Sequence, residues 1–273
     1  MTRGIIYMLS GVRYAELLCV SLASLRRHWH GPVVVFVTDA DCEAAVRRIY
    51  LHKDCELGVD ILQFDKAAAA RKKGNYCTKP SVCRASKFDQ TIFLDADTVV
   101  VAPIDELFTA PFTVTRFDAW QTQGRIMRSR ISEWQGTSPA VDKLVAASLE
   151  RSLPAINTGV LAFERISPVL PLWERLTLAG SHLPLTDELA MQLLTANGDL
   201  GIRVLQDEWN WSPKYSQSPL ERAKIVHWHG RSMFRKPQAE AIWRPYLDAA
   251  IADNAGGLAD WAGQYDDAVK RML

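Results

Sequence analysis

Two aspartates, Asp95 and Asp97, interrupt an apolar and β-branched run at residues 91–101, which reads TIFLDADTVVV. Two carboxylates at this spacing can converge on one hard cation. A cation held mainly by carboxylates is usually Mg²⁺ or Mn²⁺, which shares its coordination sphere with phosphate oxygens of a substrate. The pair therefore predicts a metal site for a phosphate-containing ligand. Acids also end strands and start turns by bonding to local backbone N–H groups, so this alternative stays open for the pair alone.

The elements that must position the aspartates alternate between strand and helix patterns. Strand-like runs and helical spacings follow one another at 4–9, 14–27, 33–37, 42–50 and 59–64. Three βα repeats before residue 90 predict an α/β fold of Rossmann-like type, with a mixed, mainly parallel sheet flanked by helices. Ligands of such sheets bind outside the carboxyl ends of the strands. Asp95 and Asp97 are expected at that edge.

Lys79 lies at the start of a predicted short helix that ends near residue 88 and leads into the aspartate strand. Thr78 is a plausible N-cap, and Pro80 is tolerated in a first helical turn. A helix N-terminus and an ammonium group together favour an anion, so Lys79 is a candidate cation for a phosphate group. The alternative for Lys79 is an ordinary surface lysine.

The second half of the chain contains a long segment at 118–156 in which the strand pattern disappears, which predicts a lid or an acceptor wall. Large side chains in and after it either line an acceptor cleft or pack in the core: Trp120, Arg125, Arg128, Trp134, Trp209 and Trp211. Past Pro237 the sequence reads as two amphipathic helices. We therefore expect one domain at 1–237 with a helical extension at 238–273 packed on it.

The composition of the 273 residues is that of a globular protein, with 48% hydrophobic and 23% charged residues and a net charge of +1. The charge balance gives no reason to expect a nucleic-acid surface. No apolar run reaches the roughly 18 residues of a membrane span, and the N-terminus has no signal-like apolar region, so a cytoplasmic location is expected. The five cysteines are odd in number and lack Cys-x-x-Cys spacing, which argues against structural zinc or a disulfide framework.

The order of motifs through most of the chain resembles the glycogenin-like family of retaining glycosyltransferases. That family has the GT-A fold and uses nucleotide sugars with a divalent metal. The matching elements are Thr78-Lys79, the run FLDADTVV at 93–100, IDELF at 104–108, NTGV at 157–160, Asp187-Glu188, and His227-x-x-Gly230.

The resemblance implies that Asp95, Asp97 and His227 bind the metal, Mn²⁺ or Mg²⁺. It also implies that Asn157 and Asp187 border the transferred sugar, with the Asp187-Glu188 dipeptide at the β-face of the anomeric carbon. A diphosphate leaving group develops negative charge that a metal and a cation can neutralise, and Lys79 is the candidate cation. The predicted catalytic residues are Lys79, Asp187 and Glu188.

The nucleotide-sugar donor is expected to lie along the same edge of the sheet. Tyr7 and Ser10, at the end of the first strand, would border the base and ribose, and Asp118 would accept hydrogen bonds from sugar hydroxyls. The expected donor contacts are Tyr7, Ser10, Lys79, Asp95, Ala96, Asp118, Asn157, Gly230, Arg231 and Lys236.

Two positions depart from the family pattern. The family usually has glutamine where this chain has Glu188, and an acid there either changes sugar selectivity or offers a carboxylate to the reacting carbon. The family's lysine soon after the His-x-x-Gly glycine is missing, and either Arg231 or Lys236 substitutes for it.

The sequence predicts a metal-dependent hexosyltransferase that moves a sugar from a nucleotide-diphosphate donor, UDP-linked, to a glycan, lipid, protein or small-molecule acceptor with retention. Two alternatives stay open. One is a haloacid-dehalogenase-like phosphatase with Asp95 as nucleophile, whose downstream acidic pair would be Asp266-Asp267. The other is a non-catalytic nucleotide-sugar-binding protein of the same fold. Taken singly, His227 is also typical of a strand end, Asn157 of a turn, and Asp187 of a first helical turn.

Overall fold

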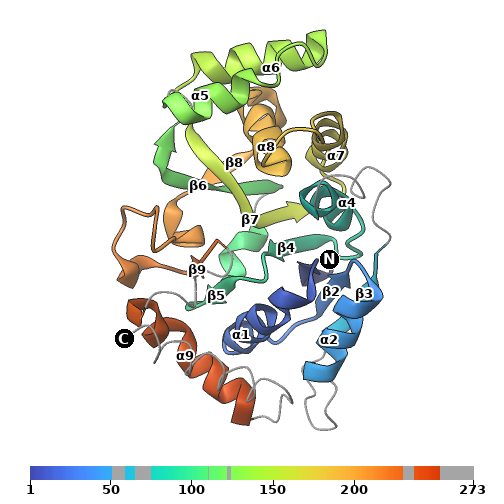
Figure 1. Ribbon diagram of the computed structural model, residues 1–273, viewed down its shortest axis with the longest axis vertical. Helices are drawn as coiled ribbons and strands as arrows, with labels where there is room; N and C mark the ends of the chain where they lie inside the picture. Colours follow the sequence, from blue (N-terminus) through green and yellow to red (C-terminus); the bar gives the residue numbers. More distant parts are fainter. Residues whose placement is uncertain (51–58, 65–74, 110, 122–123, 230–236, 253–273) are drawn as a thin grey trace.

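A computed structural model describes residues 1–50, 59–64, 75–109, 111–121, 124–229 and 237–252. They form a mixed α/β fold around a seven-stranded sheet (Figure 1). From one edge to the other, the strands are β3 (Val59–Gln63), β2 (Val33–Val37), β1 (Arg3–Leu9), β4 (Gln90–Leu94), β7 (Pro154–Glu164), β6 (Phe112–Gln121) and β8 (Arg203–Leu205).

The sheet is mainly parallel, as predicted. Strands β3, β2, β1 and β4 pair in parallel, β7 runs antiparallel to both β4 and β6, and β8 is parallel to β6. The residues of β2 and β4 are all buried, as is typical of parallel strands covered on both faces. Their lack of polar alternation is what made these strands recognisable in the sequence.

Two hydrophobic clusters cover the two faces of the sheet. Ile5 and Tyr7 of β1 belong to the first, with α1 (Ala15–Arg26), α2 (Ala40–Tyr50) and α9 (Pro237–Ala252). Ile6, between them, belongs to the second, because successive side chains of a strand point to opposite faces. The second cluster contains residues of α4 (Lys79–Arg84), α5 (Arg125–Ser132), α6 (Pro139–Glu150), α7 (Val169–Ala179) and α8 (Thr186–Ala196).

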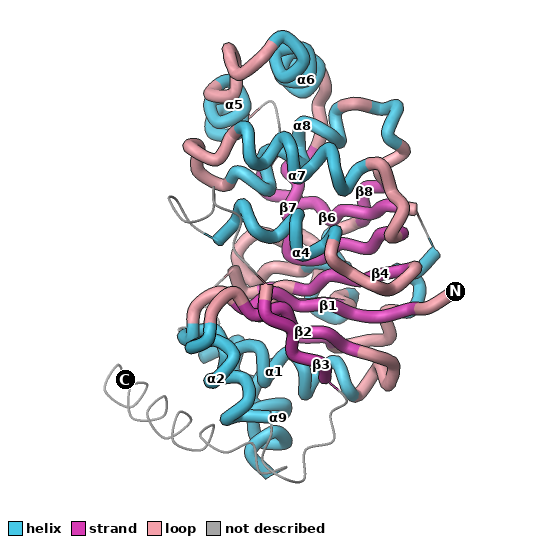
Figure 2. The backbone as a smooth tube through the Cα atoms, turned by 90° about the vertical axis from the view of Figure 1, so that its right-hand side faces the viewer, coloured by secondary structure: helices cyan, strands magenta, loops and turns pink. Residues whose placement is uncertain are grey.

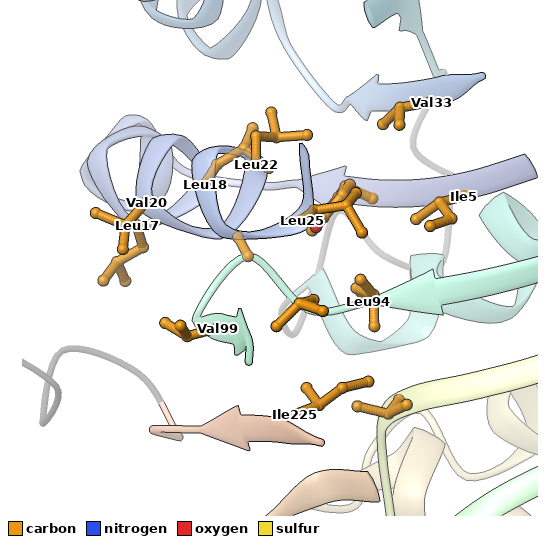
Figure 3. Close-up of a cluster of buried hydrophobic side chains, with 14 of the residues drawn as sticks. Ile5, Leu17, Leu18, Val20, Leu22, Leu25, Val33, Leu94, Val99 and Ile225 are labelled. Carbon is orange, nitrogen blue, oxygen red and sulfur yellow. The ribbon is translucent and has the colours of Figure 1, made fainter. Parts of the chain in front are cut away.

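The first cluster extends to a small second sheet. Its strands β5 (Thr98–Val100) and β9 (Ile225–His227) pair antiparallel, with Thr98 opposite His227. Figure 3 shows side chains of α1, β1, β2 and β4 gathered with Val99 of β5 and Ile225 of β9. This pairing brings a histidine from late in the chain to the aspartate segment. Short 3₁₀ turns occupy Val12–Tyr14, Asn75–Thr78, Asp105–Thr109, Gly198–Leu200, Asp207–Asn210 and Leu220–Arg222.

The predicted strand-free segment at 118–156 is wrong at both ends. Strand β6 continues to Gln121 and β7 begins at Pro154, and the two pair with register shifts that interrupt regular alternation. Between them, α5 and α6 lie at the end of the molecule far from α9 (Figures 1 and 2). Trp134 has no exposed surface and packs against Gly180, so it belongs to the core instead of an acceptor wall.

Helix α9 packs on α1 through Trp243 and Leu247, both fully buried. The rest of the expected extension, 253–273, lies outside the described residues. Among the helices that the structure describes, none is long and apolar enough to cross a membrane.

Candidate metal centre

The aspartates form a short turn between β4 and β5, at the carboxyl end of the parallel strands. Within the turn, the N–H and the hydroxyl of Thr98 donate to the Asp95 carbonyl at 3.2 and 2.8 Å. The Asp95 N–H donates to the Gly159 carbonyl of β7 at 2.8 Å, and the Trp228 N–H donates to the Asp97 carbonyl at 3.1 Å. Backbone hydrogen bonds to two other segments therefore hold both ends of the turn.

Asp95, Asp97 and His227 form a cluster whose ligand atoms all lie within 4.8 Å of one another. The Nε2 atom of His227 is 3.2 Å from Asp97 Oδ1 and 3.8 Å from Asp95 Oδ2. Burial is the largest single influence and lowers the pKa of His227, but the Asp97 and Asp95 carboxylates together raise it above the ordinary value. Two carboxylates and one imidazole nitrogen together form a donor set that fits Mn²⁺ or Mg²⁺.

Lys79 lies behind this cluster and is buried, with 5% of its surface exposed. Its Nζ is 3.0 Å from Asp95 Oδ1 and 3.4 Å from Asp187 Oδ2, and it donates to the carbonyl and hydroxyl of Thr158, both at 3.3 Å. Burial lowers the pKa of Lys79, and these two carboxylates raise it above its ordinary value. The alternative of a surface lysine is therefore wrong, because Lys79 is buried and connects the Asp95–Asp97–His227 cluster to Asp187.

Asp187 is held in the first turn of α8. The Thr158 hydroxyl donates to its Oδ2 at 2.7 Å, and the Trp173 indole N–H donates to its carbonyl at 2.8 Å. Its Oδ1 is buried and has no hydrogen-bond partner among the described residues. Lys79 is thus the counter-ion of two acids, one on the aspartate turn and one on α8.

Glu188 is half-buried beside Asp187. The Asn157 amide donates to its Oε1 at 2.6 Å. Burial raises the pKa of Glu188 to about 8, and the neighbouring Asp187 charge acts in the same direction. The predicted sugar-bordering residues Asn157, Asp187 and Glu188 therefore lie together at the ends of β7 and α8.

Sequence reasoning missed Asn210, which connects Asn157 to His227 of the Asp95–Asp97–His227 cluster. Asn210 has no exposed surface. Its Nδ2 donates to Asn157 Oδ1 and to Thr115 Oγ1, both at 2.7 Å, and its Oδ1 lies 2.8 Å from His227 Nδ1. The sequence offered one signal, the position of the Asn210 amide between Trp209 and Trp211. A buried amide needs hydrogen-bond partners on both of its ends.

His229, also missed, packs its ring against that of His227 with centroids 4.0 Å apart. The rings of Phe117 and Tyr215 lie 4.8 and 5.4 Å from it. Burial lowers the pKa of His229 to about 2, and the neighbouring His227 also lowers it. A neutral aromatic group therefore adjoins the metal cluster.

The two predicted donor contacts at the first strand, Tyr7 and Ser10, differ in their exposure. Tyr7 is a correction, because its phenol is fully buried on the α1 face and bonds to the Ser21 hydroxyl at 3.0 Å, so its side chain offers no surface to a nucleotide. Ser10 lies at the end of β1, half-buried, with its hydroxyl 2.9 Å from that of Thr38 at the end of β2. Ala96 is buried inside the aspartate turn.

Other predicted contacts are not described at the level of side chains. Asp118 lies in β6, where only its backbone is placed, and Gly230, Arg231 and Lys236 lie outside the described residues. Thr78 occupies the N-cap position of α4, as predicted, but its side chain makes no capping hydrogen bond among the described residues.

Comparisons with known proteins identify the fold. No family model matches this chain, and no curated protein matches it. Among solved structures, the chain is similar to the bifunctional glycosyltransferase WbbM in its apo form, with a TM-score of 0.60 and 13% sequence identity. The match covers 91% of this chain and 49% of WbbM, so the chain spans about half the length of that protein. The chain therefore has a glycosyltransferase fold with a possible Asp-Asp-His metal site.

Proposed function

We propose that this protein is a metal-dependent retaining glycosyltransferase that transfers a sugar from a UDP-linked donor to an acceptor. One observation carries the proposal: on a glycosyltransferase fold, Asp95, Asp97 and His227 converge to within 4.8 Å at the carboxyl edge of the sheet. The motif order that resembles glycogenin-like enzymes supports the retaining class and the UDP donor.

In this proposal Asp95, Asp97 and His227 hold Mn²⁺ or Mg²⁺, which neutralises charge on the departing diphosphate when it is bound. Lys79 fixes the orientation of the Asp95 carboxylate and adds a permanent positive charge behind it, since both of its acidic partners keep it protonated. A preoriented cation of this kind stabilises charge that develops in the transition state.

Asp187 and Glu188 border the transferred sugar, and Asn157 holds Glu188 at 2.6 Å. Glu188, which is half-buried, is suited to meet sugar hydroxyls, whereas the buried Asp187 acts through its ion pair with Lys79. Ser10, the backbone of the Asp95–Asp97 turn, Asp118, Gly230, and either Arg231 or Lys236 complete the donor site in the proposal.

The glycosyltransferase fold gives no support to the phosphatase alternative, whose required Asp266-Asp267 pair lies outside the described residues. A non-catalytic nucleotide-sugar binder shares every feature of the site. Turnover is the property that separates it from an enzyme.

The test is a thermal-shift screen of nucleotide sugars with and without Mn²⁺, followed by a product assay with the stabilising donor. We expect a UDP-sugar to raise the Tm only when Mn²⁺ is present, and UDP to be released. The control is Asp60→Asn, which changes an exposed aspartate of β3 and should behave as the wild type. Metal-dependent binding of UDP without transfer or hydrolysis would establish a binding protein. A burst of aspartyl-phosphate formed from a phosphomonoester would establish the phosphatase.

A further inference from the structure

We infer that Asn210 is a positioning residue that fixes the proton of His227 on Nδ1, so that Nε2 carries the lone pair that binds the metal. The inference rests on the proposed metal site, although the hydrogen-bond pattern that carries it involves only residues of the described chain. It follows in three steps from one backbone N–H group.

The first step fixes the amide of Asn157. The Gly159 N–H donates to Asn157 Oδ1 at 2.9 Å, and a backbone N–H can only donate. The atom of Asn157 that it meets must therefore be the oxygen. The other end of the same amide, Nδ2, then faces the carboxylate oxygen of Glu188 at 2.6 Å, as a donor should.

The second step fixes the amide of Asn210. Its end group lies 2.7 Å from Asn157 Oδ1, which is an acceptor, so that end must be Nδ2. The same Nδ2 meets the Thr115 hydroxyl at 2.7 Å, which accepts its second hydrogen. The Thr115 hydroxyl directs its own hydrogen to the carbonyl of Asn157 or Val160, at 3.3 and 3.4 Å. A flipped Asn210 would place two amide oxygens 2.7 Å apart without a hydrogen between them.

The third step fixes His227. With Nδ2 of Asn210 turned to Asn157 and Thr115, its Oδ1 faces His227 Nδ1 at 2.8 Å and can only accept. His227 Nδ1 must therefore carry a hydrogen. In the neutral imidazole this leaves the lone pair on Nε2, the atom that lies 3.2 Å from Asp97 and 3.8 Å from Asp95. The metal-binding atom is thus directed at the two carboxylates.

Burial makes this chain of hydrogen bonds favour one tautomer of His227 over the other. Asn210, Thr115 and Asn157 are at most 2% exposed, so solvent does not replace a lost partner at these atoms. A buried amide oxygen that faces an unprotonated nitrogen loses its hydrogen bond, which opposes the alternative tautomer. Without Asn210, the carboxylate of Asp97 would favour the hydrogen on Nε2, in the position that the metal needs.

The test compares Asn210→Leu with Thr115→Val. Asn210→Leu removes the hydrogen bonds to Asn157, Thr115 and His227, and Thr115→Val removes the hydrogen bond with Asn210 and the longer ones to β7 carbonyls. Both variants disturb the same buried network, so a purely structural role predicts that Mn²⁺ affinity falls only in step with Tm. We expect only Asn210→Leu to weaken Mn²⁺ binding, by about 10- to 100-fold as for other groups that orient a metal-bound histidine. The binding of Mn²⁺ alone is measured by the paramagnetic resonance signal of the free ion.

A second measurement reads the tautomer directly. Nitrogen-15 correlation spectra of the metal-free chain are recorded at a pH where the His227 imidazole is neutral. We expect the hydrogen on Nδ1 in the wild type and in Thr115→Val, and on Nε2 in Asn210→Leu. A wild-type hydrogen on Nε2, or equal loss of Mn²⁺ affinity in both variants, would overturn the inference. A wild type that binds Mn²⁺ with the expected tautomer but transfers no sugar would overturn only the proposed function.

Discussion

The ring of His227 lies directly against Gly159 of β7. A Cβ atom at Gly159 would lie 2.3 Å from Cε1 and 2.6 Å from Nδ1 of that ring, distances that real side chains essentially never show. The same Cβ would lie 2.8 Å from Asn157 Oδ1. Glycine at this position therefore leaves the space that His227 and its hydrogen-bonded neighbours occupy.

Gly159→Ala should displace His227 and weaken Mn²⁺ binding by at least about tenfold, because the orientation of a metal ligand governs its affinity. Isothermal titration with Mn²⁺ measures the effect. Gly198→Ala is the control, since its Cβ would meet only the far end of the Arg151 side chain, at 3.2 Å. Unchanged affinity in Gly159→Ala would show that His227 does not bind the metal.

Asp97→Ala should abolish metal-dependent turnover and leave the fold intact. The Asp97 carboxylate lies next to His227 Nε2 and is removed in the variant. The Asp97 backbone carbonyl, which accepts a hydrogen bond from the Trp228 N–H, remains and should keep the turn in place. Turnover with a UDP-sugar is measured beside the circular dichroism spectrum. A variant that keeps the wild-type rate would remove Asp97 from the proposed site.

Lys79→Met should reduce both kcat and stability. Removing the ammonium leaves Asp95 and Asp187 without their shared counter-ion, and breaking a buried ion pair costs about 3–5 kcal/mol. Rates must therefore be measured well below the Tm of the variant. Lys224→Met is the control, because its ion pair with Glu106 is at the surface and should contribute about 1 kcal/mol or less. A normal kcat with a raised KM would instead make Lys79 a donor-binding residue.

Glu188→Gln should change how the stability of the metal-free chain depends on pH. Because burial raises the pKa of Glu188 to about 8, the folded chain binds more protons than the unfolded chain between the ordinary glutamate pKa and pH 8. The free energy of unfolding should therefore fall as pH rises through this range, by at most about 1.4 kcal/mol per pH unit from this group. The glutamine variant should lack that contribution.

Urea unfolding of both chains from pH 5 to pH 8.5 measures this difference. Glu133→Gln, which changes an exposed glutamate after α5, should keep the wild-type pH dependence. Parallel pH profiles for the wild type and Glu188→Gln would mean that Glu188 ionises in the folded chain as it does in water.

The parallel half of the sheet was predictable because β2 is an uninterrupted apolar run and β4 ends in one, which is typical of strands that are buried on both faces. Strands β6 and β7 were harder to place. Their pairing shifts register after Val114 and after Phe117, so the side chains lose the alternation that indicates a strand. The pattern therefore predicts no strand at 118–121 or 154–156, where the structure has the end of β6 and the start of β7.

The candidate site was predictable to different degrees. The Asp95–Asp97 turn could be identified from its own spacing, whereas His227 was implied only by family resemblance. The ion pair from Lys79 to Asp187 joins residues 108 positions apart (187 − 79), which no local pattern encodes. Asn210 was missed for the same reason, since its partners come from β6, β7 and β9.

The pairing of β5 with β9 also affects how folding can be followed. Thr98 and His227 face each other in this small sheet, yet about 130 residues of chain separate the aspartates from the histidine. The three side chains of the proposed metal site can meet only after that intervening chain has folded and β9 has docked. Capture of Mn²⁺ during refolding should therefore report a late event, at a time when fluorescence from the buried tryptophans already reports a formed core.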